Sequence, residues 1–276
     1  MKASVRWVEC PRDAWQGFSR FIPTEEKVAF LNELLEAGFA HLDLTSFVSP
    51  KWVPQMQDAE EVLKALPPPN GRTYLAIVAN EKGLERALAA PNLTHVGYPF
   101  SLSETFQQRN TNRSIEASWP LVGAMVERTE GRLGLVVYLS MAFGNPYGEP
   151  NTLDLVAEWA HKAANQWQPS VLSISDTVGS ATPQSIRDVV ATVQQAAGGT
   201  RLGLHLHMPA AEALTNGLLE AAWDSGIRRF DSALLGLGGC PFAQNHLVGN
   251  LPSEALLTFA TARGASFGVK PLALES

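Results

Sequence analysis

Two histidines separated by one residue carry the sharpest chemical signal in the sequence. His205 and His207 flank Leu206 in a run typical of a buried strand. Side chains alternate along a strand, so both imidazoles lie on one face and Leu206 on the other. Two imidazoles on one face suit a divalent cation, and Asp13 would add a carboxylate to the set. From the pattern alone, two hydrogen-bonded core histidines are the competing interpretation.

Arg12 stands beside Asp13 near the end of the first predicted strand. An arginine at that place can stabilise an oxyanion while the aspartate binds a metal. On spacing alone, an ion pair at the surface explains the two residues equally well. Asp176 and Thr177 follow the sixth predicted strand, where such residues form a turn or a helix cap more often than a catalytic pair.

The two cysteines differ in their surroundings. Cys240 lies in the glycine-rich stretch 236–241, where small residues let a loop move over a substrate and carry a thiol to it. A small buried side chain is the alternative, and it is the interpretation for Cys10, inside the first predicted strand. Two cysteines are too few for a disulfide framework, and the first residues lack an apolar signal region. The cytoplasm is the expected location.

These residues must be positioned by short β-rich runs that alternate with longer stretches of helical period. The predicted strands are Val5–Cys10, His41–Phe47, Arg72–Ala79, His95–Phe100, Leu133–Leu139, Val171–Ser175, Arg201–His207 and Arg229–Ala233. A helical pattern follows each of them. In the first long one, Thr24 is expected as the N-cap and Gly38 as the C-terminal stop.

Eight strand-then-helix units predict an α/β fold, a (β/α)8 TIM barrel forming a single domain over residues 1–276. A doubly wound open sheet is the alternative, but no glycine-rich phosphate turn follows the first strand. Active sites of barrels form at the carboxyl ends of the strands, so we expect the polar residues found there to converge. They are Arg12, Asp13, Asp43, Ser46, Asp176, Thr177, His205 and His207.

Composition excludes two classes of partner. The 276 residues are 45% hydrophobic and 17% charged, and the net charge of −6 comes without a basic run. Nucleic acid and anionic membranes are therefore not expected as partners. No stretch approaches the roughly 18 apolar residues that a membrane span requires.

Two segments carry a family resemblance. Residues 45–56 read TSFVSPKWVPQM and residues 236–243 read GLGGCPFA. Weaker similarity runs through 103–106, 110–116, 145–147 and 176–179, so it covers nearly the whole chain. On these segments the sequence resembles the 3-hydroxy-3-methylglutaryl-CoA lyases of the metal-dependent lyase and synthase barrel superfamily. The cysteine loop separates these lyases from the condensing synthases and carboxyltransferases of that superfamily.

The resemblance implies an activity and a set of site residues. The family cleaves an acyl-CoA thioester, 3-hydroxy-3-methylglutaryl-CoA, to acetyl-CoA and acetoacetate in leucine degradation, and it suggests a homodimer. Matching positions imply that Mg²⁺ or Mn²⁺ is bound by Asp13, His205, His207 and Asn250. They assign catalysis to Arg12, Cys240, Asp43 and Asp176. They assign substrate binding to Gln16, Ser46 and Thr177.

The sequence also departs from the family pattern. Asp43 stands where the lyases usually have Glu, Met208 replaces a polar residue after His207, and one extra residue precedes Asn250. Two other functions therefore stay open at this point. One is a synthase that condenses an acyl-CoA with a 2-oxo acid, and the other is a catalytically silent barrel that binds a CoA ester.

Overall fold

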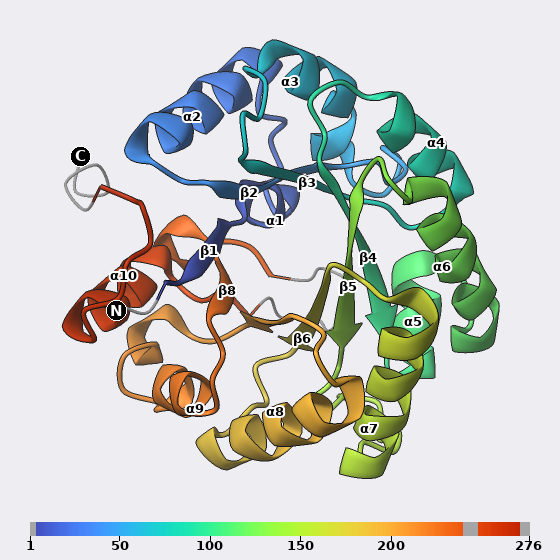
Figure 1. Cartoon of the computed structure of the whole chain (residues 1–276). Coiled ribbons are helices and arrows are strands. Elements are labelled where there is room, and N and C mark those ends of the chain that lie inside the picture. Colours follow the sequence, from blue (N-terminus) through green and yellow to red (C-terminus); the bar gives the residue numbers. More distant parts are fainter. Residues whose placement is uncertain (1–3, 240–247, 271–276) are drawn as a thin grey trace.

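The strands close into a barrel in which each pairs in parallel with its neighbours in chain order (Figure 1). The computed structural model describes residues 4–239 and 248–270. The strands are β1 (Arg6–Glu9), β2 (His41–Ser46), β3 (Thr73–Ile77), β4 (His95–Ser101), β5 (Gly134–Ser140), β6 (Val171–Asp176), β7 (Leu202–Leu206) and β8 (Arg229–Ser232). Every predicted strand is confirmed to within two residues at each end. The predicted TIM barrel is therefore confirmed.

Helices surround the barrel and connect successive strands (Figure 1). They are α1 (Pro11–Gln16), α2 (Thr24–Ala37), α3 (Ala59–Ala65), α4 (Glu81–Ala89), α5 (Glu104–Thr111), α6 (Ile115–Thr129), α7 (Leu153–Lys162), α8 (Pro183–Ala197), α9 (Leu218–Asp224) and α10 (Ser253–Ala262). Short 3-10 turns lie at η1 (Pro54–Met56), η3 (Ala210–Glu212) and η4 (Leu234–Gly236), and a π turn, η2 (Ala163–Trp167), extends α7. Within the described ranges, no helix is both long and apolar enough to cross a bilayer.

The start of α2 differs from the sequence prediction. Pro23 occupies the N-cap position, and Thr24 is the first helical residue rather than the cap. Its hydroxyl donates instead to Asp58, 2.8 Å away, just before α3. The Thr24 side chain, which the local pattern assigned to helix capping, therefore bonds to a residue next to another helix. Gly38 ends the helix as predicted, with a φ of 100° in the left-handed region.

Apolar side chains form two separate layers. The outward faces of the strands pack beneath the helices in one large cluster, which includes Trp7, Leu42 and Tyr74. A smaller cluster inside the barrel comes from β3, β5 and β6, and its members are Leu75, Ile77, Val136, Tyr138 and Val171. Polar groups complete the inside of the barrel, since Arg229 and Asp231 of β8 pair with each other and Asp231 contacts His205 of β7.

Candidate functional site

The loops that follow β1 and β7 bring the expected metal ligands together. Helix α1 starts directly after β1, with Pro11 in its first turn, and carries Arg12 and Asp13 over the end of the barrel. His205 lies in β7 and His207 one residue beyond it. A bridge between His207 and Asn250 fixes the chain after β8 beside the end of β7. Four predicted ligands from opposite ends of the sequence therefore meet at one place.

Asp13, His205 and His207 form a group that could hold a metal ion. One ligand atom from each lies within 4.8 Å of the others. The Nε2 atoms of His205 and His207 are 3.0 Å apart and face each other. In the metal-free protein, one proton must bridge this pair, because two bare lone pairs would repel at that distance. A divalent cation would replace that proton, so the residues present fit a metal.

Charges around Asp13 keep its carboxylate ionised. Burial alone would raise the pKa of Asp13, but the charges of Arg12 and His205, with a hydrogen bond from Asn250, lower it to about 2. Oδ1 accepts from Arg12 at 2.8 Å and from Gln16 at 2.6 Å, and Oδ2 accepts from Asn250 at 2.6 Å. The carboxylate is therefore held in place and negatively charged, as a metal ligand requires.

The two histidines differ in their electrostatics. Burial and the neighbouring charge of His205 lower the pKa of His207 to about 3. Burial also acts to lower the pKa of His205, but the hydrogen bond and charge of Asp231 outweigh it and raise that pKa. His207 is thus neutral, and the bridging proton belongs to His205.

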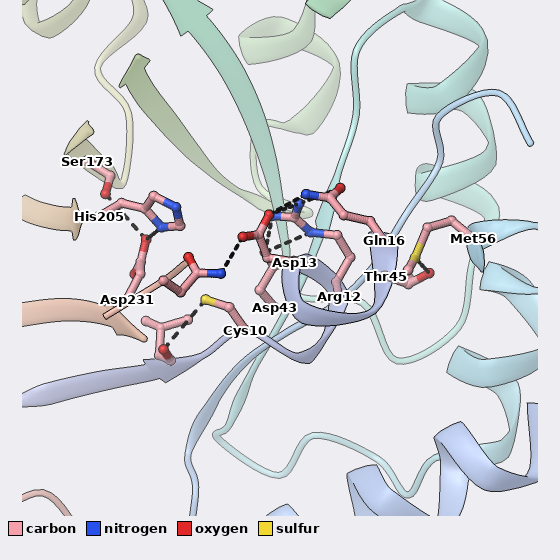
Figure 2. A network of polar contacts seen from close by, with 12 residues as sticks. Cys10, Arg12, Asp13, Gln16, Asp43, Thr45, Met56, Ser173, His205 and Asp231 are labelled. Atoms are coloured by element: carbon pink, nitrogen blue, oxygen red, sulfur yellow. Dashed lines mark hydrogen bonds and ion pairs between the residues drawn. The ribbon is translucent and has the colours of Figure 1, made fainter. Parts of the chain in front are cut away.

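Asp231 is a site residue that the sequence analysis missed. It lies in β8 in register with His205, and its Oδ2 is 3.3 Å from His205 Nδ1 (Figure 2). Arg229 holds the other oxygen at 2.7 Å. A carboxylate behind a ligating histidine fixes the ring and its tautomer. The sequence did carry a signal for Asp231, because a carboxylate inside a strand predicted to be fully buried needs a partner. Which partner it has depends on the register between β7 and β8.

Arg12 joins the metal group to Asp43. Its Nε and Nη2 donate to Asp43 Oδ2 at 3.0 and 2.5 Å, and its Nη1 reaches Asp13 (Figure 2). Burial raises the pKa of Asp43, although Arg12 opposes the shift. Asp43 Oδ1 is buried and has no hydrogen-bond partner among the described residues. The arginine is thus anchored by two carboxylates, and one oxygen of Asp43 is left for another proton.

The predicted substrate residues line one cavity, whereas Asp43, Asp176 and Asn250 are not among its lining residues. A cavity of about 850 Å³ at the carboxyl ends of the strands is lined by Arg12, Asp13, Gln16, Ser46, Thr177, His205 and His207 among others. The oxygens of Asp176 accept from the backbone N–H groups of Ser180 and Ala181 at 2.9 Å. Asp176 therefore stabilises the loop before α8, which is the turn-type role that its position in the sequence also allowed. Cys240 lies outside the described residues.

A carboxylate and two histidines that converge at the carboxyl ends of a (β/α)8 barrel, where they could hold a metal, are typical of a barrel enzyme. A model of the HMGL-like family matches residues 5–275. The chain is 36% identical to the mitochondrial hydroxymethylglutaryl-CoA lyase of Mus musculus, over 94% of this chain and 78% of that protein. It is 33% identical to hydroxymethylglutaryl-CoA lyase YngG of Bacillus subtilis, over 90% and 81%.

Solved structures agree with the sequence comparisons. An HMG-CoA lyase from Acinetobacter baumannii, in complex with coenzyme A and 3-methylmalate, superposes with a TM-score of 0.90 at 30% identity, over 98% of this chain and 88% of that one. The hydroxymethylglutaryl-CoA lyase from Pseudomonas aeruginosa gives 0.89 at 32% identity, over 99% and 90%. The chain belongs to the HMGL-like family, as the sequence resemblance indicated.

Proposed function

We propose that the protein cleaves 3-hydroxy-3-methylglutaryl-CoA to acetyl-CoA and acetoacetate, with Mg²⁺ or Mn²⁺ bound by Asp13, His205, His207 and Asn250. The observation that carries the proposal is the convergence of a carboxylate and two imidazoles within 4.8 Å, in the cavity of a chain from the HMGL-like family. Relatives named for this activity align over nearly the whole chain. The family and the site thus point to one reaction.

The cavity is proposed to bind an acyl-CoA thioester. A solved relative holds coenzyme A together with a branched dicarboxylate. In this chain, Arg109 and Arg113 lie among the residues that line the same cavity as Arg12 and Asp13. These arginines give the cavity positive charges that match the phosphates of an anionic ligand. Gln16, Ser46 and Thr177 line the cavity as well and are proposed to bind the acyl part.

Carbon–carbon cleavage needs a base at the tertiary hydroxyl and a cation at the thioester oxygen. A bound divalent metal supplies a Lewis acid that orients the substrate and acidifies the hydroxyl. Asp43 Oδ1, which has no partner among the described residues, is proposed to take the hydroxyl proton. The C2–C3 bond then breaks, the hydroxyl carbon becomes a ketone, and the electron pair moves into the thioester enolate. Arg12 stabilises the enolate oxygen. Cys240 is proposed to give a proton to C2, and the proton taken up by Asp43 then returns to the Cys240 thiolate through solvent, which closes the cycle.

Three further properties go with this activity as proposals: a role in leucine degradation, a location in the cytoplasm, and a homodimeric state. The family resemblance suggests the first and the last. Mass measurement of the purified protein tests the homodimer directly.

The test is an assay coupled to acetyl-CoA release from 3-hydroxy-3-methylglutaryl-CoA, with Mg²⁺ or Mn²⁺ and with a chelator. We expect release that the chelator abolishes. Arg12→Gln should lower turnover by about 100-fold or more while metal binding persists, because it removes the charge at the developing enolate. Arg128→Gln, a matched loss of one positive charge at an exposed position of α6, should leave turnover unchanged. A folded, metal-loaded protein that releases no acetyl-CoA would refute the proposal.

A further inference from the structure

Five basic residues gather at the amino ends of the barrel strands, opposite the cavity. Arg6, His41, His95 and Arg229 are the first residues of β1, β2, β4 and β8, and Arg201 immediately precedes β7. We call these five residues the basic mouth. None of them lines the cavity that holds the metal group. Arg229 pairs with Asp231 behind His205, and nothing in the proposed lyase reaction uses the other four.

Strand register directs these side chains to the inside of the barrel. Arg229 lies two residues before Asp231, which bonds to His205. His41 lies two residues before Asp43, which bonds to Arg12. Asp231 and Asp43 point into the barrel, so alternation places Arg229 and His41 on the inner face as well. Arg6 pairs with Arg229 in register, and His95 pairs with Gly134. The basic residues therefore occupy the lowest inward-facing positions of their strands.

Glycines make room for two of the side chains. A Cβ at Gly134 would stand 2.4 Å from the ring of His95, and one at Gly203 would stand 2.5 Å from Nη1 of Arg229. Real Cβ atoms do not approach so closely, so these two positions admit only glycine with the present neighbours. The barrel end is thus shaped around basic groups and not around the apolar layers usual in such barrels.

The charge of the basic mouth is poorly balanced. Among the described residues, its one ion pair joins Arg229 to Asp231, at 2.7 Å. Arg6 and Arg201 are exposed, and neither has an acidic partner in that part of the chain. Burial, followed by the charges of Arg6 and Arg229, lowers the pKa of His41 to about 4. Burial and the same arginines also lower the pKa of His95. The site therefore repels further positive charge.

Donors remain available for a ligand. The Nδ1 atoms of His41 and His95 are 2.8 Å and 2.9 Å from the hydroxyls of Thr73 and Thr94, which leaves Nε2 of each ring to donate to an anion when the ring is protonated. The guanidinium groups of Arg6 and Arg201 present planar forks that match the oxygens of a tetrahedral anion. Exposure of these two arginines gives a ligand access from solvent.

We propose that the basic mouth binds a small oxyanion, with inorganic phosphate as the simplest member of the class. Arg6 of β1 and Arg201, just before β7, would hold the oxygens of the anion from the solvent side. His41 and His95 would face the anion from inside the barrel. Arg229 is already paired with Asp231. It therefore adds positive charge to the basic mouth but does not present a free guanidinium fork to the anion. The proposal goes beyond the lyase function and does not depend on it, since none of the five residues lines the cavity of the proposed reaction.

The test titrates the histidine ring resonances of the full chain by NMR, with phosphate or chloride at equal ionic strength and without substrate. His41→Gln and His95→Gln identify the two signals. We expect phosphate to raise the pKa of both rings, because an anion offsets the repulsion that lowers them. Chloride at the same ionic strength should raise them less.

Affinity measured in the same titration separates a built site from general screening. Arg6→Gln combined with Arg201→Gln should weaken phosphate binding more than tenfold, whereas Arg128→Gln on α6 should not weaken it. Equal histidine shifts in phosphate and chloride would overturn the proposal. So would an unchanged phosphate affinity in the double variant, provided that its melting temperature matches that of the parent protein. Neither result bears on acetyl-CoA release, so this inference and the lyase function fail separately.

Discussion

Asp231 decides which nitrogen His205 presents to the site. Its carboxylate lies 3.3 Å from Nδ1, so the ring turns Nε2 toward His207 and Asp13. Arg229 in turn holds Asp231 at 2.7 Å. A carboxylate, histidine and metal in series are a recurring arrangement in which the outer acid sets the tautomer and strengthens the ligand. Asp231 is therefore a positioning residue for the metal group.

Replacement of Asp231 tests this role. Asp231→Asn should weaken Mn²⁺ binding by about 10- to 100-fold, because the ring loses its charged orienting partner. Calorimetric titration of Mn²⁺ measures the effect. Asp188→Asn, a matched change at a half-buried position of α8 where the carboxylate accepts from Gln184, should leave the affinity unchanged. An Asp231→Asn protein that folds and binds Mn²⁺ as tightly as the parent would show that Asp231 only pairs with Arg229.

The sequence predicted which residues share a face better than it predicted the partner to which each residue bonds. Alternation in 205–207 predicted that both histidines share a face, and the structure confirms it. The spacing of Asp43 and Arg12 gave no sign that they would bond, because that contact depends on β2 lying beside β1. Asp176 had two interpretations, and only the fold shows that its oxygens accept from the amides of its own loop.

At the level of elements, strands could be predicted because buried parallel strands are nearly continuous apolar runs. Helix ends were less certain. Thr24 is a residue type that often caps helices, but its hydroxyl bonds to Asp58. This contact joins two elements, so the local sequence pattern does not predict it. Register could not be predicted at all, and it is register that places Asp231 against His205 and Arg6 against Arg229.

The turn after η4 packs closely against two of the proposed metal ligands, Asp13 and Asn250. Gly238 has a φ of 98°, and a Cβ there would lie 2.6 Å from the backbone oxygen of Asp13 and 2.7 Å from Nδ2 of Asn250. Gly238→Ala should push this turn away from both ligands and weaken Mn²⁺ binding more than tenfold. Titration of Mn²⁺ into each variant measures it.

A matched glycine separates backbone strain from contact with the ligands. Gly148 also has a positive φ, 72°, but a Cβ there would meet nothing within 4 Å. Gly148→Ala should therefore cost about 1 kcal/mol of stability without changing Mn²⁺ affinity. If both variants bound Mn²⁺ like the parent protein, the close approach of Gly238 to Asp13 would have no bearing on the metal group.

At the scale of the whole molecule, Glu9 helps to close the barrel. It lies in β1 with its side chain fully buried, accepts from the amide of Leu234 at 2.7 Å, and bonds to the hydroxyl of Ser253 in α10. Burial raises the pKa of Glu9 from 4.5 to about 8, although these hydrogen bonds oppose the shift. The first strand is thus joined to the last helix through a carboxyl group that is neutral at pH 7.

This raised pKa sets the sign of a pH effect on stability. The folded state binds the Glu9 proton more tightly than the unfolded chain, so the contribution of Glu9 is fully present below about pH 4.5 and is lost as pH rises toward 8. Glu9→Gln keeps the hydrogen bonds of a neutral carboxyl and removes the titration. The free energy of unfolding of this variant, relative to the parent, should therefore rise between pH 5 and 8 and then level off.

Urea unfolding at a series of pH values, in the presence of chelator, measures this difference curve. Subtraction removes the effects of His207 and His41, whose lowered pKa values reduce stability below about pH 6.5 in both proteins alike. Glu127→Gln, on the exposed side of α6, should give a flat difference over the same range. A flat curve for Glu9→Gln would mean that Glu9 ionises at its ordinary pKa, and that water reaches the contact between β1 and α10.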